Sequence, residues 1–148
     1  MKTTVTNPET TAAWTRAEID ALQARLIESK RWLDAFPGPL EAPCLLRRVW
    51  DTGGGDLEAL PLAEKVVVGR KGDPPFAFPD DVVLSERHFR IEVGSGGRCY
   101  AEDLGSRNGL CINDRRVPHR WLVHGDKIHA GNQNFVLHDG RGLEEDED

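Results

Sequence analysis

Apolar residues are spaced in two different ways along this chain of 148 residues. Between Ile19 and Phe36 they recur at intervals of three, four or seven positions, which is typical of one face of an α-helix. From residue 44 onward, short apolar runs alternate with turn residues, as in the run 44–50 and the glycine-rich segment 52–56. The sequence therefore predicts one N-terminal helix followed by a region of β-strands.

The predicted helix covers residues 15–36. Thr15 and Glu18 match a capping box, in which Thr15 occupies the N-cap and Glu18 the third helical position. A Pro-Gly pair ends the helix, residues 37–43 form a linker, and residues 1–14 form a flexible, threonine-rich leader. The apolar stripe fits either packing on the chain's own domain or contact with a second copy or a partner, and one stripe does not decide between them.

The region from 44 to 140 has the pattern of an all-β sandwich or barrel, because several short strands follow each other with turn signals between them. After the first strand we expect strands at Pro61–Gly69, His88–Val93, Arg98–Leu104, Leu110–Ile112, Lys127–Ala130 and Asn134–His138, and a short extended piece at Asp81–Leu84. Residues 141–148 are expected to be a disordered acidic tail.

Composition and charge exclude several classes of function. The net charge is −6, but the last five residues are all acidic, so the rest of the chain carries about −1 and has no basic excess for nucleic acid. No run approaches the ~20 apolar residues of a membrane span, and the N-terminus has no secretory signal. Three cysteines favour a reducing compartment. We therefore expect a cytoplasmic protein that binds neither nucleic acid nor membrane.

Metal and catalytic interpretations have little support. The positions of His119, His124, His129, Cys99 and Cys111 match no zinc-binding spacing, and both cysteines are expected in the core. The neighbouring carboxylates at positions 102 and 103 face opposite sides of a strand and form no catalytic pair. Trp50 and Trp121 are expected to be core or turn anchors. We predict no metal, no cofactor and no enzymatic activity.

Polar residues at the predicted strand ends are suited to capturing a phosphate group. Arg70 offers a planar guanidinium for two phosphate oxygens, and Arg107 adds a second cation. Ser85 can contribute its hydroxyl and a backbone N–H. Asn108 has an amide that can hold a peptide backbone, because it both donates and accepts hydrogen bonds. One ring nitrogen of His88 can bond a neighbouring loop and keep Ser85 in position.

These residues resemble the forkhead-associated (FHA) domain family. The matching pieces are Gly69-Arg70, Ser85-x-x-His88 and Asn108-Gly109, with the flanks VVVGR, DVVLSERHFRI, YAEDLGSRNGLCIN and HGDKIHAGNQNFVL. The resemblance covers about residues 44–138 and implies an eleven-stranded β-sandwich that recognises phosphothreonine peptides through its rim loops, without catalysis. It implies that Arg70 and Ser85, with Arg107, bind phosphate and that Asn108 binds the peptide backbone. His88, Gly69 and Gly109 would support the site.

One residue departs from the family pattern. The position after the serine is often basic or polar in the family, but here it is Glu86. A carboxylate and one phosphate charge ~6 Å apart repel by roughly 3 kcal/mol at an effective dielectric constant of 20. We expect Glu86 to weaken phosphate binding or to select an unusual ligand.

The leader offers a second, weaker resemblance. Pro8-Glu9-Thr10-Thr11 resembles a phosphosite that precedes the FHA domain in some small actinobacterial regulators. There the phosphorylated threonine folds back into the protein's own FHA site and blocks partner binding. By this resemblance Thr10 or Thr11 would be an internal ligand.

The sequence as a whole predicts a phosphothreonine-peptide recognition module that docks a phosphorylated partner in Ser/Thr kinase signalling. The alternative is a phospho-independent scaffold or assembly protein, in which the FHA site is degenerate and the N-terminal helix forms a homodimer. The mass of the protein in solution and its dependence on concentration distinguish the two.

Overall fold

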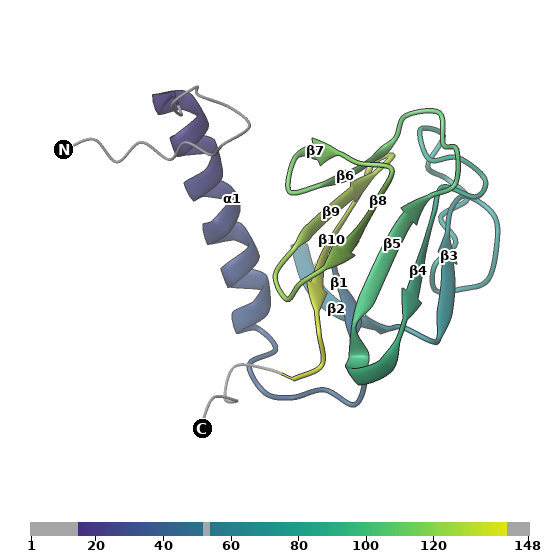
Figure 1. Cartoon of the computed structure of the whole chain (residues 1–148), viewed down its shortest axis with the longest axis horizontal. Coiled ribbons are helices and arrows are strands. Elements are labelled where there is room, and N and C mark those ends of the chain that lie inside the picture. The colour runs from purple at the N-terminus through teal and green to yellow at the C-terminus, as the bar shows by residue number, and fades with distance from the viewer. Residues whose placement is uncertain (1–14, 52–53, 142–148) are drawn as a thin grey trace.

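The computed structural model describes residues 15–51 and 54–141, which form one helix and ten strands in two antiparallel sheets (Figure 1). The predicted β-sandwich is confirmed. Helix α1 covers Arg16–Asp34, and a 3₁₀ turn covers Ser95–Gly97. The strands are β1 (Cys44–Asp51), β2 (Gly54–Pro61), β3 (Lys65–Val68), β4 (Phe89–Val93), β5 (Cys99–Asp103), β6 (Leu110–Ile112), β7 (Arg115–Arg116), β8 (His119–Leu122), β9 (Lys127–Ala130) and β10 (Gln133–His138).

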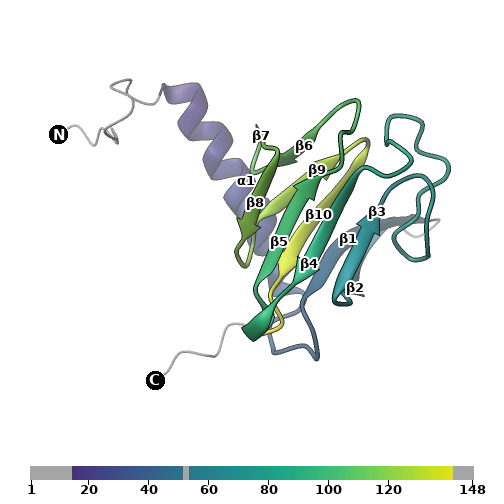
Figure 2. The ribbon, with the colours of Figure 1, turned by 45° about the vertical axis from the view of Figure 1, so that its right-hand side comes forward.

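The two sheets lie face to face. The larger has the order β2-β1-β10-β9-β6-β7 and the smaller has the order β3-β4-β5-β8 (Figure 2). Side chains of β4 alternate between the two faces: Phe89 and Ile91 are fully buried between the sheets, whereas Arg90 and Glu92 lie on the outer surface. This alternation follows from the two-residue period of a strand and places the main core between the layers.

Strand β10 is buried on both faces, because α1 covers the outer side of the larger sheet. Phe135 and Leu137 point into the main core, whereas Val136 packs against Trp32 of α1 in a second apolar cluster. Trp32 is 4% exposed. The C-terminal half of the predicted apolar stripe therefore packs on the chain's own domain. The N-terminal half of the stripe remains open, since Ile19 is 37% and Leu26 is 56% exposed, and the neighbouring Ile27 is also 56% exposed.

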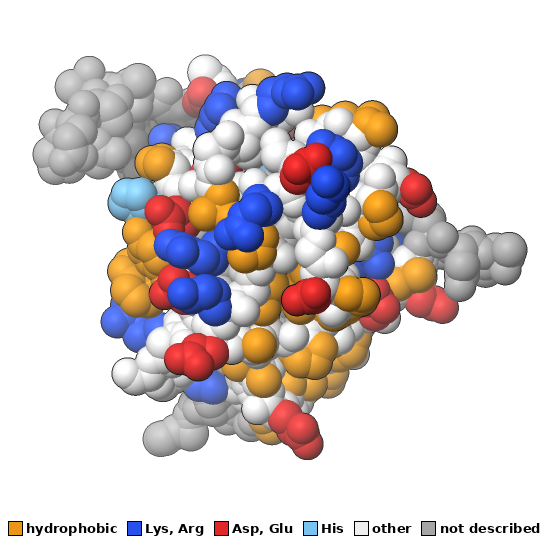
Figure 3. Space-filling model, turned by 90° about the vertical axis from the view of Figure 1, so that its right-hand side faces the viewer, with side chains coloured by type: hydrophobic (Ala, Val, Ile, Leu, Met, Phe, Trp, Pro, Cys, Tyr) orange, Lys and Arg blue, Asp and Glu red, His pale blue; other side chains and the backbone are white. Residues whose placement is uncertain are grey.

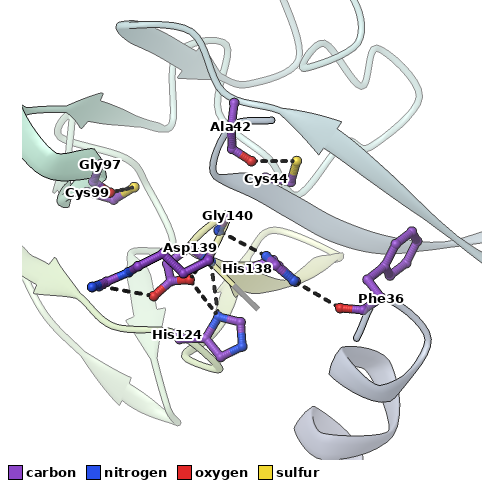
Figure 4. A network of polar contacts seen from close by, with 10 residues as sticks. Phe36, Ala42, Cys44, Gly97, Cys99, His124, His138, Asp139 and Gly140 are labelled. Carbon is purple, nitrogen blue, oxygen red and sulfur yellow. Dashed lines mark hydrogen bonds and ion pairs between the residues drawn. The ribbon is translucent and has the colours of Figure 1, made fainter. Parts of the chain in front are cut away.

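Polar contacts stabilise the start of α1 and attach the helix and the segment after it to the larger sheet. The capping box predicted at Thr15 and Glu18 is confirmed at the start of α1. Lys127 on β9 forms an ion pair of 2.7 Å with Glu28. At the other end, the Nδ1 of His138 accepts from the Gly140 N–H, so its Nε2–H donates to the Phe36 carbonyl at 3.0 Å (Figure 4).

Several local predictions were wrong, and tertiary pairing explains most of the differences. The segment 54–56, predicted as a turn, begins β2, which pairs with β1 along its whole length. The segment Asp81–Leu84 is a turn, because the Asp81 carboxylate accepts from backbone N–H groups within it. Strands β7 and β8 were not predicted.

Some predicted side-chain environments also differ. Trp121, expected as a core or turn anchor, is 50% exposed on the edge strand β8, with Arg98 over its ring at 4.4 Å. Cys99 is buried as predicted, but Cys111 is only half-buried. The side chain of Trp50 lies outside what the structure describes. No helix in the described part of the chain has the length and apolarity needed to cross a membrane.

Candidate functional site

The predicted site residues lie on two loops at one end of the sandwich. The first loop joins β3 to β4 and the second joins β5 to β6 (Figure 1). The candidate residues on these loops are Gly69, Arg70, Ser85, His88, Arg107, Asn108 and Gly109. Segments about 20 residues apart in the chain therefore meet at one rim of the fold.

His88 is a buried connection between the two loops. It is fully buried, and its Nδ1 accepts from the Ser85 N–H at 3.0 Å. The proton must therefore be on Nε2, which lies 2.7 Å from the Gly109 carbonyl and donates to it. One neutral imidazole thus fixes the backbone of Ser85 relative to the turn at Gly109.

Two further hydrogen bonds join the same loops at the surface. The Ser85 hydroxyl oxygen accepts from the Arg107 N–H at 3.1 Å, and the Asn108 side-chain amide donates to the Val83 carbonyl at 3.0 Å. The Ser85 hydroxyl proton is not used in its contact with Arg107. The Asn108 Oδ1 makes no hydrogen bond within the described residues. Both groups can therefore serve a ligand.

Steric constraints explain why glycine stands at positions 69 and 109. A Cβ on Gly69 would run into the backbone carbonyl of Glu86, because the segments 69–71 and 85–86 lie side by side. Gly109 has a φ of +88°, which L-residues rarely adopt, and the Arg116 side chain lies against it. A larger residue at position 69 would push the loop segments 69–71 and 85–86 apart, and one at position 109 would strain the backbone and displace the Arg116 side chain.

Arg70 is oriented along the rim by its own hydrogen bond. Its Nε donates to the Leu84 carbonyl at 2.8 Å, and its side chain is 35% exposed. The Glu86 carboxylate lies 4.0 Å from the Arg70 guanidinium and 3.4 Å from the Lys71 ammonium. Glu86 therefore offsets part of the positive charge that would attract a phosphate to Arg70. Lys71 is a further cation, which the sequence pattern did not single out.

These groups surround one shallow depression. Arg70, Ser85, Glu86 and Arg107 line its polar side, and the exposed Val82 lies on its apolar side. Arg107 is exposed, and its guanidinium forms no ion pair within residues 15–51 and 54–141. The depression therefore offers two arginines and a hydroxyl to an anionic group, with an apolar surface beside them.

Asp81 is a supporting residue that sequence reasoning missed. Its side chain is buried and accepts from the N–H groups of Val83 and Leu84 in its own turn, from Asn132 in the β9–β10 turn and from Gln133 at the start of β10. Burial by itself raises the pKa of Asp81, but these hydrogen bonds outweigh it and hold the pKa below its usual value. The one available signal was an aspartate four residues before Ser85, at the start of the segment that the sequence predicted to be extended.

One histidine cluster has ligand atoms close enough to consider a metal ion. Atoms of His124, His138 and Asp139 lie within 4.8 Å of one another (Figure 4). Both ring nitrogens of His138 already bond backbone groups, and His124 Nδ1 accepts from the Asp139 N–H at 3.1 Å. We therefore interpret this cluster as a structural connection between β10 and the segment that follows α1.

Comparisons with known proteins agree with this geometry. Residues 66–131 match the family model of the FHA domain. The ABC transporter ATP-binding/permease protein Rv1747 of Mycobacterium tuberculosis is 39% identical over 69 residues, which is 45% of this chain and 8% of that protein. The chain thus spans about 8% of the length of the curated relative that it matches.

Solved structures give the same result. A domain solved in a study of phosphothreonine-dependent FHA domain interactions is 29% identical, with a TM-score of 0.52, covering 66% of this chain and 96% of that one. The FhaA FHA domain, solved in complex with the intracellular domain of Rv3910, is 30% identical, with a TM-score of 0.51, covering 64% and 98%. This chain belongs to the FHA domain family, whose members are phosphothreonine-binding modules.

Proposed function

We propose that this protein docks a phosphothreonine segment of a partner in Ser/Thr kinase signalling and catalyses no reaction. Arg70, Ser85 and Arg107 bind the phosphate, and Asn108 binds the peptide backbone. The observation that carries the proposal is the shared rim depression in which two arginines flank the Ser85 hydroxyl. The buried His88 supports it, because it holds the two loops in one arrangement before any ligand arrives.

The direct test is binding of an oriented phosphothreonine peptide library to the full chain. Phosphoserine and unphosphorylated libraries serve as ligand controls. Arg70→Ala is expected to weaken phosphothreonine binding about tenfold to hundredfold, because it removes a charge-assisted hydrogen bond. Arg31→Ala, an exposed arginine on α1, is the matched control. Equal binding of phosphorylated and unphosphorylated libraries would contradict the proposal.

A cytoplasmic location is part of the same proposal. Cys44, Cys99 and Cys111 are all free thiols, which supports a reducing compartment.

Thr10 and Thr11, the internal ligands suggested by the leader, lie outside the described residues. If either threonine is a ligand, phosphorylating it will lower the affinity of the chain for an added phosphopeptide, and removing residues 1–14 will restore that affinity.

The exposed half of α1 favours a second candidate function, which is self-assembly. Leu26 and Ile27 remain open to solvent, and among the side chains that the structure describes the helix packs on the larger sheet through its C-terminal half. In that case the mass in solution will rise with concentration in both wild-type protein and Arg70→Ala, and Leu26→Lys will abolish the rise. A constant monomer mass excludes this function and leaves the phosphopeptide proposal unaffected.

A further inference from the structure

A second depression lies along the edge strand β3, directly beside the phosphate-binding rim. It has a volume of about 690 Å³. Its walls are mostly apolar and include Ala63, Val67 and the pair Pro74-Pro75, and the buried Phe76 also lines it. Figure 3 views the molecule from the side of β3 and shows Lys and Arg side chains interspersed with hydrophobic surface.

Glu86 separates the groove from the phosphate site and lines both of them. One oxygen of its carboxylate, Oε2, lies 4.0 Å from the Arg70 guanidinium, which lines the phosphate site, and 3.4 Å from the ammonium of Lys71, which lines the groove. Backbone hydrogen bonds hold Glu86 in place between the two depressions, because the Arg70 N–H donates to the Ser85 carbonyl and the Lys71 N–H donates to the Glu86 carbonyl. An extended ligand that runs from one depression to the other must cross Glu86.

The charges on this path select the ligand. A phosphate beside Arg70 competes with the Glu86 carboxylate for the guanidinium and is repelled by it. A lysine or arginine of the ligand above Glu86 offsets that repulsion, because it attracts both the carboxylate and the ligand's own phosphate. Beyond this point most of the groove surface is apolar, although Lys65, Asp73 and Arg87 also line it, so a leucine-like side chain gains by leaving water.

We propose that the groove along β3 is an accessory binding site for one flank of the phosphothreonine ligand. The flank places a basic residue over Glu86 and an apolar side chain between Ala63 and Pro74. The inference rests on the proposed phosphothreonine binding at Arg70 and adds the chemical class of the partner segment: phosphothreonine, then a basic residue, then an apolar residue. The continuity of the two depressions at Glu86 is the observation that commits the groove to this occupant.

The test uses one phosphothreonine core with six residues on each side. In the reference peptide both flanks are alanine. In the others, lysine is placed next to the phosphothreonine, alone or followed by leucines, on either the N-terminal or the C-terminal flank. Isothermal titration of the full chain at fixed ionic strength gives the Kd of each peptide. We expect lysine to tighten binding about threefold and leucines to add about another threefold to tenfold, on one flank only.

Two variants separate the parts of the proposal. Glu86→Gln is expected to abolish the gain from lysine and to tighten binding of the alanine-flanked peptide. Ala63→Gln partly fills the groove and is expected to abolish the gain from leucine. The matched controls are Glu58→Gln, which alters a half-exposed ion pair on β2, and Ala24→Gln on the exposed face of α1. Ratios of Kd between peptides remain informative even if a variant changes overall stability.

The outcomes distinguish this inference from the function on which it rests. If the alanine-flanked phosphopeptide binds in an Arg70-dependent way but neither flank gives a gain, the accessory site is overturned and phosphothreonine binding stands. Gains that persist unchanged in both Glu86→Gln and Ala63→Gln also overturn it. If no phosphopeptide binds either the wild-type chain or Glu86→Gln, the proposed function fails together with the inference.

Discussion

Asp81 and Asn132 are joined by two hydrogen bonds although they are 51 residues apart in the chain. The Asn132 N–H donates to Asp81 Oδ2 at 2.8 Å, and its side-chain amide donates to Oδ1 at 3.1 Å. The same carboxylate holds the N–H groups of Val83 and Leu84, whose carbonyls accept from Asn108 and Arg70. A buried carboxylate thus positions two candidate ligand-binding side chains that it does not contact.

Asp81→Asn is therefore expected to lower both stability and phosphopeptide affinity. Asparagine keeps one acceptor oxygen and turns its NH₂ group toward donors, so buried N–H groups lose their partners at a cost of about 2 kcal/mol or more. Urea denaturation followed by circular dichroism measures the loss. The exposed neighbour supplies the control, since Asp80→Asn should change the unfolding free energy by less than about 0.5 kcal/mol. Equal stabilities of the two variants would refute this role.

His88→Phe tests the connection between the two loops. The ring fits a similar volume but makes neither hydrogen bond, which leaves the Ser85 N–H and the Gly109 carbonyl without a partner. We expect the free energy of unfolding to fall by about 2–4 kcal/mol. We expect the affinity for the phosphopeptide to fall by a larger fraction of its wild-type value. His129→Phe on the exposed face of β9 is the comparison. Wild-type affinity in His88→Phe would show that the loops hold their arrangement without it.

Stability should fall when the pH is lowered through the range of His124. Burial lowers the pKa of His124 below its usual 6.5, and the nearby Asp139 carboxylate only partly offsets this. Below pH 6.5 the unfolded chain therefore takes up a proton before the folded chain does, and stability decreases until the lower folded pKa is passed. Unfolding measured between pH 7.5 and 5 on wild type and His124→Gln isolates this contribution. Parallel profiles would contradict it.

Because the pKa of the buried Cys99 thiol is raised, we expect the protein to lose stability at alkaline pH. Burial, and then the Asp139 carboxylate, raises the pKa of Cys99 from 9.0 to about 11. Between these values the unfolded state releases a proton that the folded state keeps, so stability falls as the pH rises from 9 to 11. The profile of Cys99→Ala should be flatter over that range.

In the native state at pH 8, alkylation should proceed faster at Cys111, which is half-buried, than at Cys99.

Trp32 measures how strongly α1 belongs to the sandwich. Trp32→Ala removes a side chain that is 4% exposed and packs on Leu46 and Val136, so we expect a loss of about 3 kcal/mol or more in the unfolding free energy. Leu26→Ala, on the open half of the same helix, should cost less than about 1 kcal/mol. A small effect of Trp32→Ala on global unfolding, with early loss of helical signal, would show that α1 unfolds separately.

Local sequence chemistry determined much of this protein. Thr15 and Glu18 define the helix start by themselves, because a capping box uses only neighbouring groups. Short strands separated by turn signals indicated a sandwich or barrel, and the resemblance carried by the ordered motifs around Arg70, Ser85, His88 and Asn108 implied the sandwich and its rim loops. Each of these signals is carried by residues near one another or by an ordered set of short motifs.

Tertiary structure decided the features that depend on distant partners. The glycine-rich segment 54–56 became a strand because β1 supplied its hydrogen bonds, and Asp81 became a loop anchor because the β9–β10 turn supplied donors. The continuous burial of β10 required α1 on the outer face of the sheet. Glu86 separates the rim from the β3 groove only because the segments 70–71 and 85–86 lie side by side. Sequence spacing reports local periodicity, whereas these contacts exist only after chain segments far apart in the sequence have packed together.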